Sequence, residues 1–418
     1  MSVTVTRLPS GLTVATDTMT SVETASVGVW VGVGTRDEPA GADGIAHLLE
    51  HMAFKGTTRR SARAIAEAIE DVGGHLNAYT GREQTAYYAK VLADDTSLAL
   101  DIVADILQNS VFDPEELERE RHVVLQEIGQ AEDTPDDIVF DRFQLAAYPD
   151  QPLGKPVLGD PDVVARLGRD DLIQYLSSHY GPTQMVAVAA GRVDHQRFLD
   201  EVSTAFADLP ARAGAAGAAA QYQGGVLHED RDLEQVHAVL GFPAGSVTDP
   251  DYYAWSVYST ILGGGMSSRL FQEVREKRGL AYSIYSFGAS YRDGGTLGIY
   301  VGTDPKDLAE VLEVTCTELA LLGDVVSEVE LRRAKAQLRA GTLMGREGTS
   351  HRAEALAQQL MVFGRVVPLA EQMERLEAVT AADIARLARS IRGTVPTVAT
   401  VGPLAGVDPQ AVIRRTLG

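Results

Sequence analysis

Cysteine and basic residues are scarce in this sequence. A single cysteine, Cys316, occurs among 418 residues, which excludes an intramolecular disulfide framework and any zinc site built from several cysteines. Cys316 lies in the apolar segment VLEVTCTELALL, so we expect a buried core thiol and not a nucleophile. The 37 Lys and Arg residues are outnumbered by 58 Asp and Glu residues, which gives a net charge of −21. This balance argues against nucleic-acid binding, because that needs a basic surface.

Long hydrophobic runs are also missing. No stretch reaches the roughly 18 apolar residues that a membrane-spanning helix needs, and the N-terminal MSVTVTRLPSGLTVATDTM lacks the basic start and apolar run of a signal peptide. We therefore expect a soluble, cytoplasmic protein that does not bind membranes. Hydrophobic residues nevertheless make up 45% of the chain, which is enough for sizeable cores and excludes global disorder.

A segment of small residues divides the sequence. Residues 211–225 read ARAGAAGAAAQYQGG and carry no charge after Arg212, which is the composition of a linker. We therefore predict two domains, residues 1–210 and residues 226–418, joined by this linker.

The two parts repeat the same order of predicted elements. Period-two and all-apolar segments predict strands at 27–34, 75–80 and 85–92 in the first part, and at 236–244, 280–290 and 295–303 in the second. Helical periodicity predicts helices at 43–54, 61–72 and 95–109, and then at 250–262 and 305–322. Matching elements lie about 210 residues apart (from 27 to 236 and from 85 to 295), which indicates a tandem duplication. We expect an α+β fold of two homologous halves, each a mixed sheet with packed helices.

Two histidines one helical turn apart form the sharpest motif. Residues 47–51 read His-Leu-Leu-Glu-His. On a helix, Glu50 and His51 fall within about 60° of His47, and the apolar neighbours face the other side. The two imidazoles can therefore share one metal ion, while Glu50 can reach a metal-bound water. This is the H-x-x-E-H arrangement. The alternative, a solvated face with two histidines, is disfavoured because the chain has only nine histidines.

A catalytic zinc site of this kind needs a third protein ligand. The helix predicted over 113–130 offers Glu120 and Glu127, which both fall on its apolar arc, where a carboxylate needs a partner or a metal. The other acidic residues of its first turn are expected to be solvated and favoured by the helix dipole. The pattern does not choose between Glu120 and Glu127. They lie two turns apart, so we expect one to bind the metal and the other to support it.

Three segments resemble a known family. HLLEHMAFKGTTRRS, GGHLNAYTGREQTAYYAKV and ERERHVVLQEI resemble the pitrilysin/insulinase zinc metallopeptidases, above all the beta subunit of mitochondrial processing peptidase and its bacterial relatives. The resemblance covers essentially the whole chain. It implies that one Zn²⁺ per chain is bound by His47, His51 and Glu127, with Glu120 as an accessory catalytic residue. It also implies a clamshell of two halves around a cavity.

The second half lacks the metal motif. Its corresponding helix reads YYAWSVYSTILGGG, so it cannot bind a second metal in the same way. In GGGMSSRLFQEVREKRGLAYSIYS the glycines predict a helix end and a turn. The resemblance implies that Arg275 and Tyr282, seven positions apart, contact the substrate, with Tyr282 also donating to the oxyanion. For Arg275 the alternative is one exposed cation among several.

The resemblance also points to a substrate-binding strand. HLNAYT, residues 75–80, resembles the family's edge strand, to which an extended peptide adds near Asn77 and Ala78. An ordinary sheet strand is compatible with the same pattern. The other histidines have no ligand spacing among themselves, and we expect structural or surface positions for them: His75, His122, His179, His195, His228, His237 and His351.

Together these features predict a zinc-dependent endopeptidase that hydrolyses short or unfolded peptides in an enclosed chamber. Glu50 would act as general base toward a zinc-activated water. The acidic balance would favour basic peptides. A homodimer is expected, because one chain carries both the zinc motif and the Arg275/Tyr282 pair. The alternatives are a non-catalytic binding or scaffold subunit, as some family members are, and another hydrolase, such as an amidase, with the same metal geometry.

Overall fold

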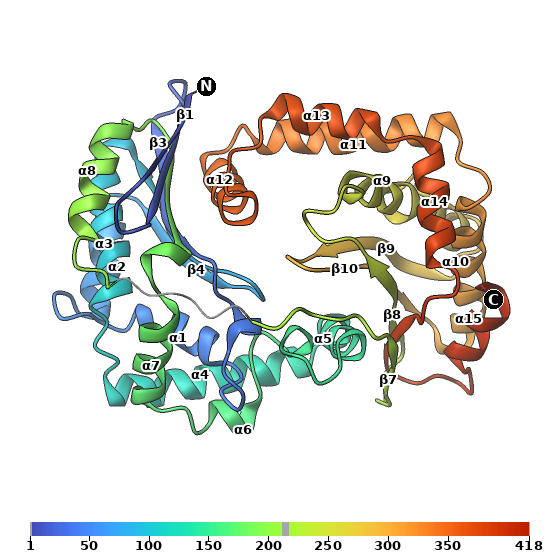
Figure 1. Ribbon diagram of the computed structural model, residues 1–418. Coiled ribbons are helices and arrows are strands. Elements are labelled where there is room, and N and C mark those ends of the chain that lie inside the picture. The colour runs from blue at the N-terminus through green and yellow to red at the C-terminus, as the bar shows by residue number, and fades with distance from the viewer. Residues whose placement is uncertain (1, 211–216, 418) are drawn as a thin grey trace. The chain divides into compact units, whose positions relative to one another are not determined.

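The structure is a computed structural model that describes residues 2–210 and 217–417 (Figure 1). The chain forms two compact units. Unit 1 consists of residues 1–129, 155–218 and 344–366, and unit 2 consists of residues 130–154, 219–343 and 367–418.

Unit 1 is built on a six-stranded mixed sheet. Its strand order is β1 (Ser2–Arg7), β2 (Thr13–Thr18), β6 (Met185–Gly191), β3 (Thr24–Val31), β5 (Thr85–Leu92) and β4 (His75–Thr80). β2 and β6 are parallel, and every other neighbouring pair is antiparallel. The predicted strands 75–80 and 85–92 are confirmed. The strand predicted at 27–34 spans Thr24–Val31, so it begins and ends three residues earlier than predicted.

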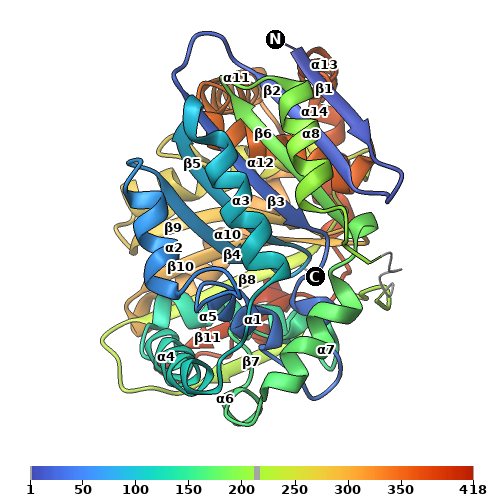
Figure 2. The ribbon, with the colours of Figure 1, turned by 90° about the vertical axis from the view of Figure 1, so that its left-hand side faces the viewer.

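Helices cover one face of this sheet around the main core of the unit. Figure 2 shows α2 (Ala62–Glu70), α3 (Thr96–Gln108) and α8 (His195–Ala205) in front of the strands. The same core includes apolar residues of α1 (Ile45–Ala53), α4 (Pro114–Glu132) and α7 (Arg169–His179), while the short α6 (Pro161–Val164) also contributes. Four of these helices, α1, α2, α3 and α4, match the predicted ranges 43–54, 61–72, 95–109 and 113–130 within two residues at each end.

The opposite face of the same sheet is covered by a helix from the second half of the sequence. α12 (Thr349–Phe363) packs on β2, β3 and β6. Its buried apolar residues contact Trp30 and the valines of β6. The buried ion pair between Arg352 Nη1 and Asp17 Oδ2, at 3.1 Å, fastens it further. The Glu354 carboxylate accepts hydrogen bonds from Trp30 Nε1 at 2.7 Å and from the Tyr79 hydroxyl at 2.6 Å.

Unit 2 repeats this plan on a five-stranded sheet. The strand order is β7 (Gly225–Glu229), β11 (Thr397–Val401), β8 (Val236–Ala244), β10 (Gly295–Thr303) and β9 (Ala281–Ser290), with β7 and β11 parallel. One core of this unit contains apolar residues of α9 (Tyr252–Gly263), α10 (Leu308–Leu322), α14 (Ala381–Ile391) and α15 (Pro409–Leu417). Cys316 is fully buried there, which confirms the predicted core thiol. Two further helices are α11 (Glu328–Gly345) and α13 (Leu369–Ala378).

The other face of the second sheet is covered by a helix from the first half of the sequence. α5 (Pro135–Ala147) packs on β7, β8 and β11, and its residues Ile138, Val139 and Phe143 are buried against them. The two halves of the sequence therefore exchange one helix each. Two α/β halves are present as predicted, but the compact units differ from the predicted contiguous domains 1–210 and 226–418. An amphipathic pattern shows that a helix needs a sheet to cover, but not which sheet.

The predicted linker at 211–225 is only partly within the described residues. Residues 211–216 lie outside them, and Gly225 already begins β7. The duplication itself is clear from the elements: β3–α1–α2–β4–β5–α3 in the first half corresponds to β8–α9–β9–β10–α10 in the second. A π-helical turn, Phe271–Glu276, stands where the first half has α2.

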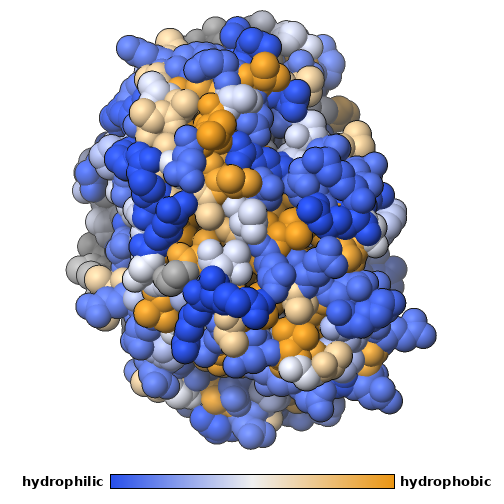
Figure 3. Space-filling view, turned by 90° about the vertical axis from the view of Figure 1, so that its right-hand side faces the viewer, coloured by the Kyte–Doolittle hydropathy of each residue, from blue (hydrophilic) through white to orange (hydrophobic). Residues whose placement is uncertain are grey.

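Within the described ranges, no helix combines the length and the apolar character that crossing a bilayer requires. On the face that Figure 3 displays, hydrophilic residues are the most common and hydrophobic residues are interspersed among them.

Candidate metal centre

The helix that carries both motif histidines begins in an unusual way. Gly44 precedes α1 with φ of 96° and provides no side-chain cap. A Cβ atom at Gly44 would lie 2.8 Å from Val164 Cγ2, so a side chain does not fit there. Instead, the carboxylate of Glu38 accepts from the Gly44 N–H at 3.0 Å and from the Ala46 N–H at 2.9 Å. Burial raises the pKa of Glu38 to about 8, although these two backbone hydrogen bonds oppose the shift.

Three side chains of unit 1 bring their donor atoms together. His47 and His51 come from α1 and Glu127 comes from α4, and one ligand atom of each lies within 4.8 Å of the others. Glu127 Oε2 is 3.7 Å from His47 Nε2 and 3.5 Å from His51 Nε2. Tetrahedral zinc with ligands at 2.0–2.1 Å separates its ligand atoms by about 3.3 to 3.4 Å. The donor set and its spacing therefore fit one zinc ion with small adjustments.

The three donors differ in burial and charge. The side chains of His47 and His51 are 11% and 17% exposed, whereas that of Glu127 is 39% exposed, which leaves an open side for a water or a substrate. Burial, with a smaller contribution from the charge of His51, lowers the pKa of His47 to about 4. His47 is therefore neutral at pH 7, which is the form that binds metals. Its buried Nδ1 has no hydrogen-bond partner within the described part of the chain.

Glu50 lies on the same helix but outside the set of three donors. Its Oε2 accepts a hydrogen bond from the Thr80 hydroxyl at 2.5 Å, and Thr80 is the last residue of β4. Burial raises the pKa of Glu50, while the Thr80 hydrogen bond and the charge of His51 act in the opposite direction. A carboxyl group with a raised pKa beside a metal-binding cluster is suited to accept and release a proton.

The structure separates the two glutamates that the sequence pattern left open. Glu127 lies with the histidines, whereas Glu120 lies behind His51, with its Oε2 3.1 Å from His51 Nδ1. The other oxygen of Glu120 is 2.6 Å from Lys55 Nζ. Glu120 thus contacts the back of an imidazole, as residues that orient metal ligands do. Sequence reasoning missed Lys55, although its spacing of four residues from His51 was a usable signal.

The predicted peptide-binding strand lies at an edge of the sheet of unit 1. Among the described residues β4 pairs with β5 alone, so its other side is a sheet edge that no strand covers. Asn77 is exposed on this strand, and its Oδ1 accepts from the Ala78 N–H at 2.9 Å. Ala78 is buried. The edge position is what strand addition by a peptide requires, and the addition itself stays a prediction.

Arg275 and Tyr282 lie together in unit 2. The guanidinium carbon of Arg275 is 4.6 Å from the ring centroid of Tyr282 and 4.7 Å from that of Phe271. Arg275 is therefore stacked between two rings and is not an isolated surface cation. Arg275 belongs to the π-helical turn. Such turns are rare in proteins, and those that occur often lie at functional sites. Tyr282 is 77% exposed, and its contact with substrate stays a prediction.

The remaining histidines lie outside the three-donor cluster. Several bond to neighbouring strands or helices: His195 contacts the hydroxyls of Thr6 and Thr16, and His237 contacts that of Tyr300. They stay structural or surface residues in our interpretation.

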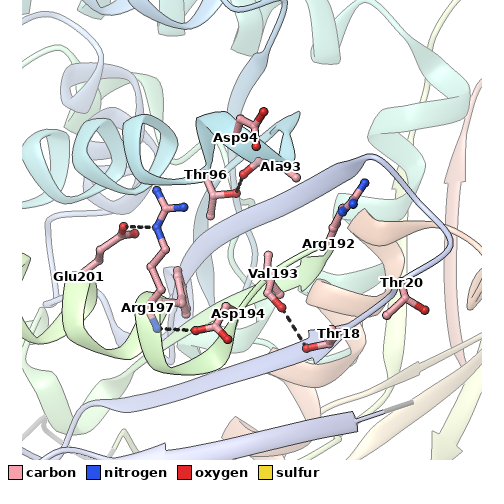
Figure 4. Close-up of a pocket in the computed structure, with 11 residues that line it drawn as sticks. Thr18, Thr20, Ala93, Asp94, Thr96, Arg192, Val193, Asp194, Arg197 and Glu201 are labelled. Atoms are coloured by element: carbon pink, nitrogen blue, oxygen red, sulfur yellow. Dashed lines mark hydrogen bonds and ion pairs between the residues drawn. The ribbon is translucent and has the colours of Figure 1, made fainter.

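A separate cavity of about 410 Å³ lies elsewhere in unit 1 and shares no residue with the donor cluster (Figure 4). Arg192 and Arg197 line it, but both are paired: Arg197 Nε lies 3.0 Å from Glu201 Oε1, and Arg192 pairs with Glu23. Asp94 and Asp194 also line the cavity, and the Asp194 side chain caps the start of α8. This cavity therefore presents no strong charge of one sign.

The sequence matches two family models in succession. Residues 13–161 match the model described as insulinase (peptidase family M16), and residues 166–338 match the model described as the peptidase M16 inactive domain. The chain belongs to peptidase family M16. The family predicted from the motifs is thereby confirmed, and the inactive-domain match fits a second half without H-x-x-E-H.

Other M16 relatives align over most of the chain. An uncharacterized zinc protease of Rickettsia felis is 39% identical over 371 residues, which is 88% of this chain and 90% of that protein. An uncharacterized zinc protease of Streptomyces coelicolor is 40% identical, over 88% of this chain and 83% of that protein. The probable beta subunit of the mitochondrial-processing peptidase of Arabidopsis thaliana is 40% identical, over 89% of this chain and 72% of that protein.

Solved structures with lower identity share the M16 fold. A protease from Helicobacter pylori superimposes with a TM-score of 0.88 at 23% identity, covering 96% of this chain and 99% of that one. A structure described as the peptidase M16 inactive domain from Pseudomonas fluorescens gives a TM-score of 0.88 at 20% identity, covering 96% and 98%.

Proposed function

We propose that this M16 family member is a zinc-dependent endopeptidase that binds one Zn²⁺ per chain through His47, His51 and Glu127. The observation that carries the proposal is the convergence of these three donors, from two helices, within 4.8 Å of one another. The names of relatives as zinc proteases support the same metal and reaction.

The residues around the donors have complementary tasks in peptide hydrolysis. When bound, zinc would supply a Lewis acid that lowers the pKa of water toward 7 and polarises a peptide carbonyl. Glu50 would take the proton of the attacking water and give it to the leaving amine. Thr80 would orient the Glu50 carboxylate through its 2.5 Å hydrogen bond. Glu120 would hold His51 from behind.

The substrate in this proposal is a short or unfolded peptide, hydrolysed in an enclosed chamber. Its backbone would add to the free edge of β4 beside Asn77 and Ala78, which makes binding nearly independent of sequence. Arg275 would hold a carbonyl or C-terminus of the peptide, and Tyr282 would donate to the oxyanion. The net charge of −21 would favour basic peptides, and this preference should weaken at high salt.

We further propose a homodimer, because a single chain carries both the metal donors and the Arg275/Tyr282 pair. Light scattering of the purified chain tests this: a mass of one chain at all concentrations would contradict it.

The central experiment measures zinc content and peptide cleavage together. Glu50→Gln should keep zinc and lose hydrolysis of a quenched peptide by several orders of magnitude, because it removes the general base. Glu67→Gln is a matched control, since Glu67 lies on the exposed face of α2. A chelator should abolish cleavage by the wild type.

The outcome of this experiment also separates the alternatives. Zinc binding without cleavage of any peptide in a library would favour a non-catalytic subunit. Cleavage of simple amides but not of peptides would favour an amidase. Chelator-resistant peptide cleavage, or full activity of Glu50→Gln, would contradict the proposed mechanism.

A further inference from the structure

The metal donors come from two helices, so the site depends on how α1 is held against α4. Lys55 is the second residue after α1 and reaches α4 from there. Its Nζ lies 2.6 Å from Glu120 Oε1, and Glu120 Oε2 lies 3.1 Å from His51 Nδ1. One continuous chain of contacts therefore links Lys55 through Glu120 to a metal donor.

The backbone around Lys55 is fixed on both sides. Its own N–H donates to the Met52 carbonyl at 3.2 Å, which continues the last turn of α1. Gly56 then turns the chain with φ of 114°, and its carbonyl accepts from the Val111 N–H at 3.1 Å. Val111 lies three residues before the start of α4. The turn that carries Lys55 is thus bonded to the segment that begins the partner helix.

Buried side chains fasten the same turn to α3. The Thr57 hydroxyl and Arg60 Nη1 both donate to Asp105 Oδ2, at 2.9 Å and 2.7 Å, and Asp105 is fully buried. Lys55 therefore extends from a rigid anchor. A flexible lysine that starts from a fixed point loses less freedom when it holds its partner in one orientation.

Charge gives Lys55 a specific task at this position. The Glu120 side chain is only 8% exposed, and Lys55 is the single Lys or Arg that pairs with it among the described residues. Glu127 adds a second carboxyl group at the other ring nitrogen of the same imidazole, 3.5 Å from His51 Nε2. A buried carboxylate needs a partner, and the contact with Lys55 fixes where the Glu120 carboxylate lies behind His51.

We propose that Lys55 is a positioning residue of the metal centre: it holds Glu120 so that the carboxylate bonds His51 Nδ1 and leaves Nε2 facing the ion. This inference rests on the proposed zinc function. In this role Lys55 acts on His51 only through Glu120.

Zinc affinity of the purified chain, measured by competition with a chelator of known affinity, tests the inference without relying on activity. Lys55→Met should weaken zinc binding about 10- to 100-fold, the range found when partners of metal-binding histidines are removed. Lys55→Arg should restore most of the affinity. Lys306→Met is the matched control, since Lys306 pairs with Asp304 at 2.8 Å on the exposed surface of unit 2, and it should bind zinc like the wild type.

A double-mutant cycle shows whether the effect passes through Glu120. In the Glu120→Gln background, adding Lys55→Met should change zinc affinity less than twofold, because the carboxylate that Lys55 holds is absent. Melting of the metal-free variants reports on stability alone. If Lys55→Met does not fold, Lys55→Gln, which keeps a hydrogen-bond donor, takes its place in the same cycle.

The possible results distinguish this inference from the function on which it rests. A wild type that binds no zinc would overturn both. A wild type that binds zinc while Lys55→Met binds it equally well would overturn only the role of Lys55. Fully additive losses in the cycle would also overturn it, because Lys55 would then act by a route other than Glu120.

Discussion

At the scale of single residues, three glutamates of unit 1 show how surroundings assign different tasks to one side chain. Glu127 faces the two imidazoles, Glu120 lies buried behind one of them beside Lys55, and Glu50 bonds to Thr80. A carboxylate that faces two imidazoles is placed to bind a metal with them, one that bonds the back of an imidazole is placed to orient it, and one that stands free of the donors is placed to move a proton.

The Thr80 hydrogen bond can be tested directly. Thr80→Val keeps the shape of the side chain but removes the hydroxyl that orients Glu50, so kcat/KM should fall about 10- to 100-fold with zinc content unchanged. Steady-state kinetics with a quenched peptide, together with metal analysis, measures both quantities. Thr80→Ser keeps a hydroxyl and should retain most of the activity; equal loss in both variants would assign the effect to packing.

The sequence predicted the histidine pair and Glu50 but could not decide the third donor. His47, Glu50 and His51 lie within one helical turn, so their relative placement follows from helix geometry alone. Glu120 and Glu127 lie on the same face of α4, and the choice depends on how α4 crosses α1, which is a tertiary property. The resemblance to a family made the choice, and the structure brings the same residue, Glu127, to the histidines.

At the scale of elements, periodicity predicts that a helix forms, but not how its end is capped or which sheet it packs on. α1 starts with hydrogen bonds to a carboxylate from outside the helix, that of Glu38. α5 and α12 each cover a sheet built mainly from the other half of the sequence. Strand patterns at 75–80 and 85–92 were sufficient to predict β4 and β5, whereas β1, β2 and β6 were missed. β6 pairs with β2 and β3, which lie far earlier in the chain, and no local pattern records that pairing. β1 and β2 form a local hairpin, and the alternation in SVTVTR was a usable signal.

Glu38 predicts a pH dependence of stability. Burial raises its pKa from the usual 4.5 to about 8, so between these values the folded protein holds a proton that the unfolded chain releases. The stability that this group contributes is complete below pH 4.5 and is lost as the pH rises through 8. Glu38→Gln does not titrate, and the difference in Tm between the variant and the wild type should move in favour of the variant as the pH rises.

Thermal melts of the metal-free proteins from pH 5 to pH 9 measure this difference. Glu67→Gln, on the exposed face of α2, provides the baseline for an ordinary glutamate. A difference for Glu38→Gln that stays constant over this range would contradict the raised pKa.

Glu354 predicts how strongly α12 is fixed to the first sheet. Glu354→Ala leaves the Trp30 indole and the Tyr79 hydroxyl without this acceptor, so the free energy of unfolding should fall by about 2–3 kcal/mol. Urea denaturation measures the change. Glu374→Ala, at an exposed position of α13, is the control, and its free energy of unfolding should fall by less than about 0.5 kcal/mol. Comparable losses in the two variants would show that Glu354 contributes no more than a surface residue.

At the scale of the whole molecule, two copies of one fold differ in chemistry. The first copy presents three side chains that could hold a metal ion, and the corresponding helix of the second, α9, carries tyrosines, serines and apolar residues instead. The sheet-and-helix plan is retained without the donors, so the fold does not depend on the metal site. In each copy, one face of the sheet is covered by an exchanged helix, α12 or α5.

The exchange predicts the behaviour of isolated halves. Residues 1–210 lack α12 and contain α5 without its sheet, so each half produced alone should expose an apolar sheet face and aggregate or unfold. Co-expression of residues 1–210 with residues 217–418 should restore a soluble, zinc-binding complex. Circular dichroism and light scattering of the separate and combined halves measure this, and a stable, monomeric first half would contradict it.

The position of α12 late in the sequence also sets an order of events during synthesis. One face of the N-terminal sheet stays bare until the ribosome has passed residue 366, although the last strand of that sheet is complete at Gly191. At roughly 5–20 residues per second, the nascent chain needs about 10–35 s to cover this distance. We expect the growing polypeptide to expose the surface around Trp30 throughout that interval, which would favour binding of chaperones that recognise apolar segments.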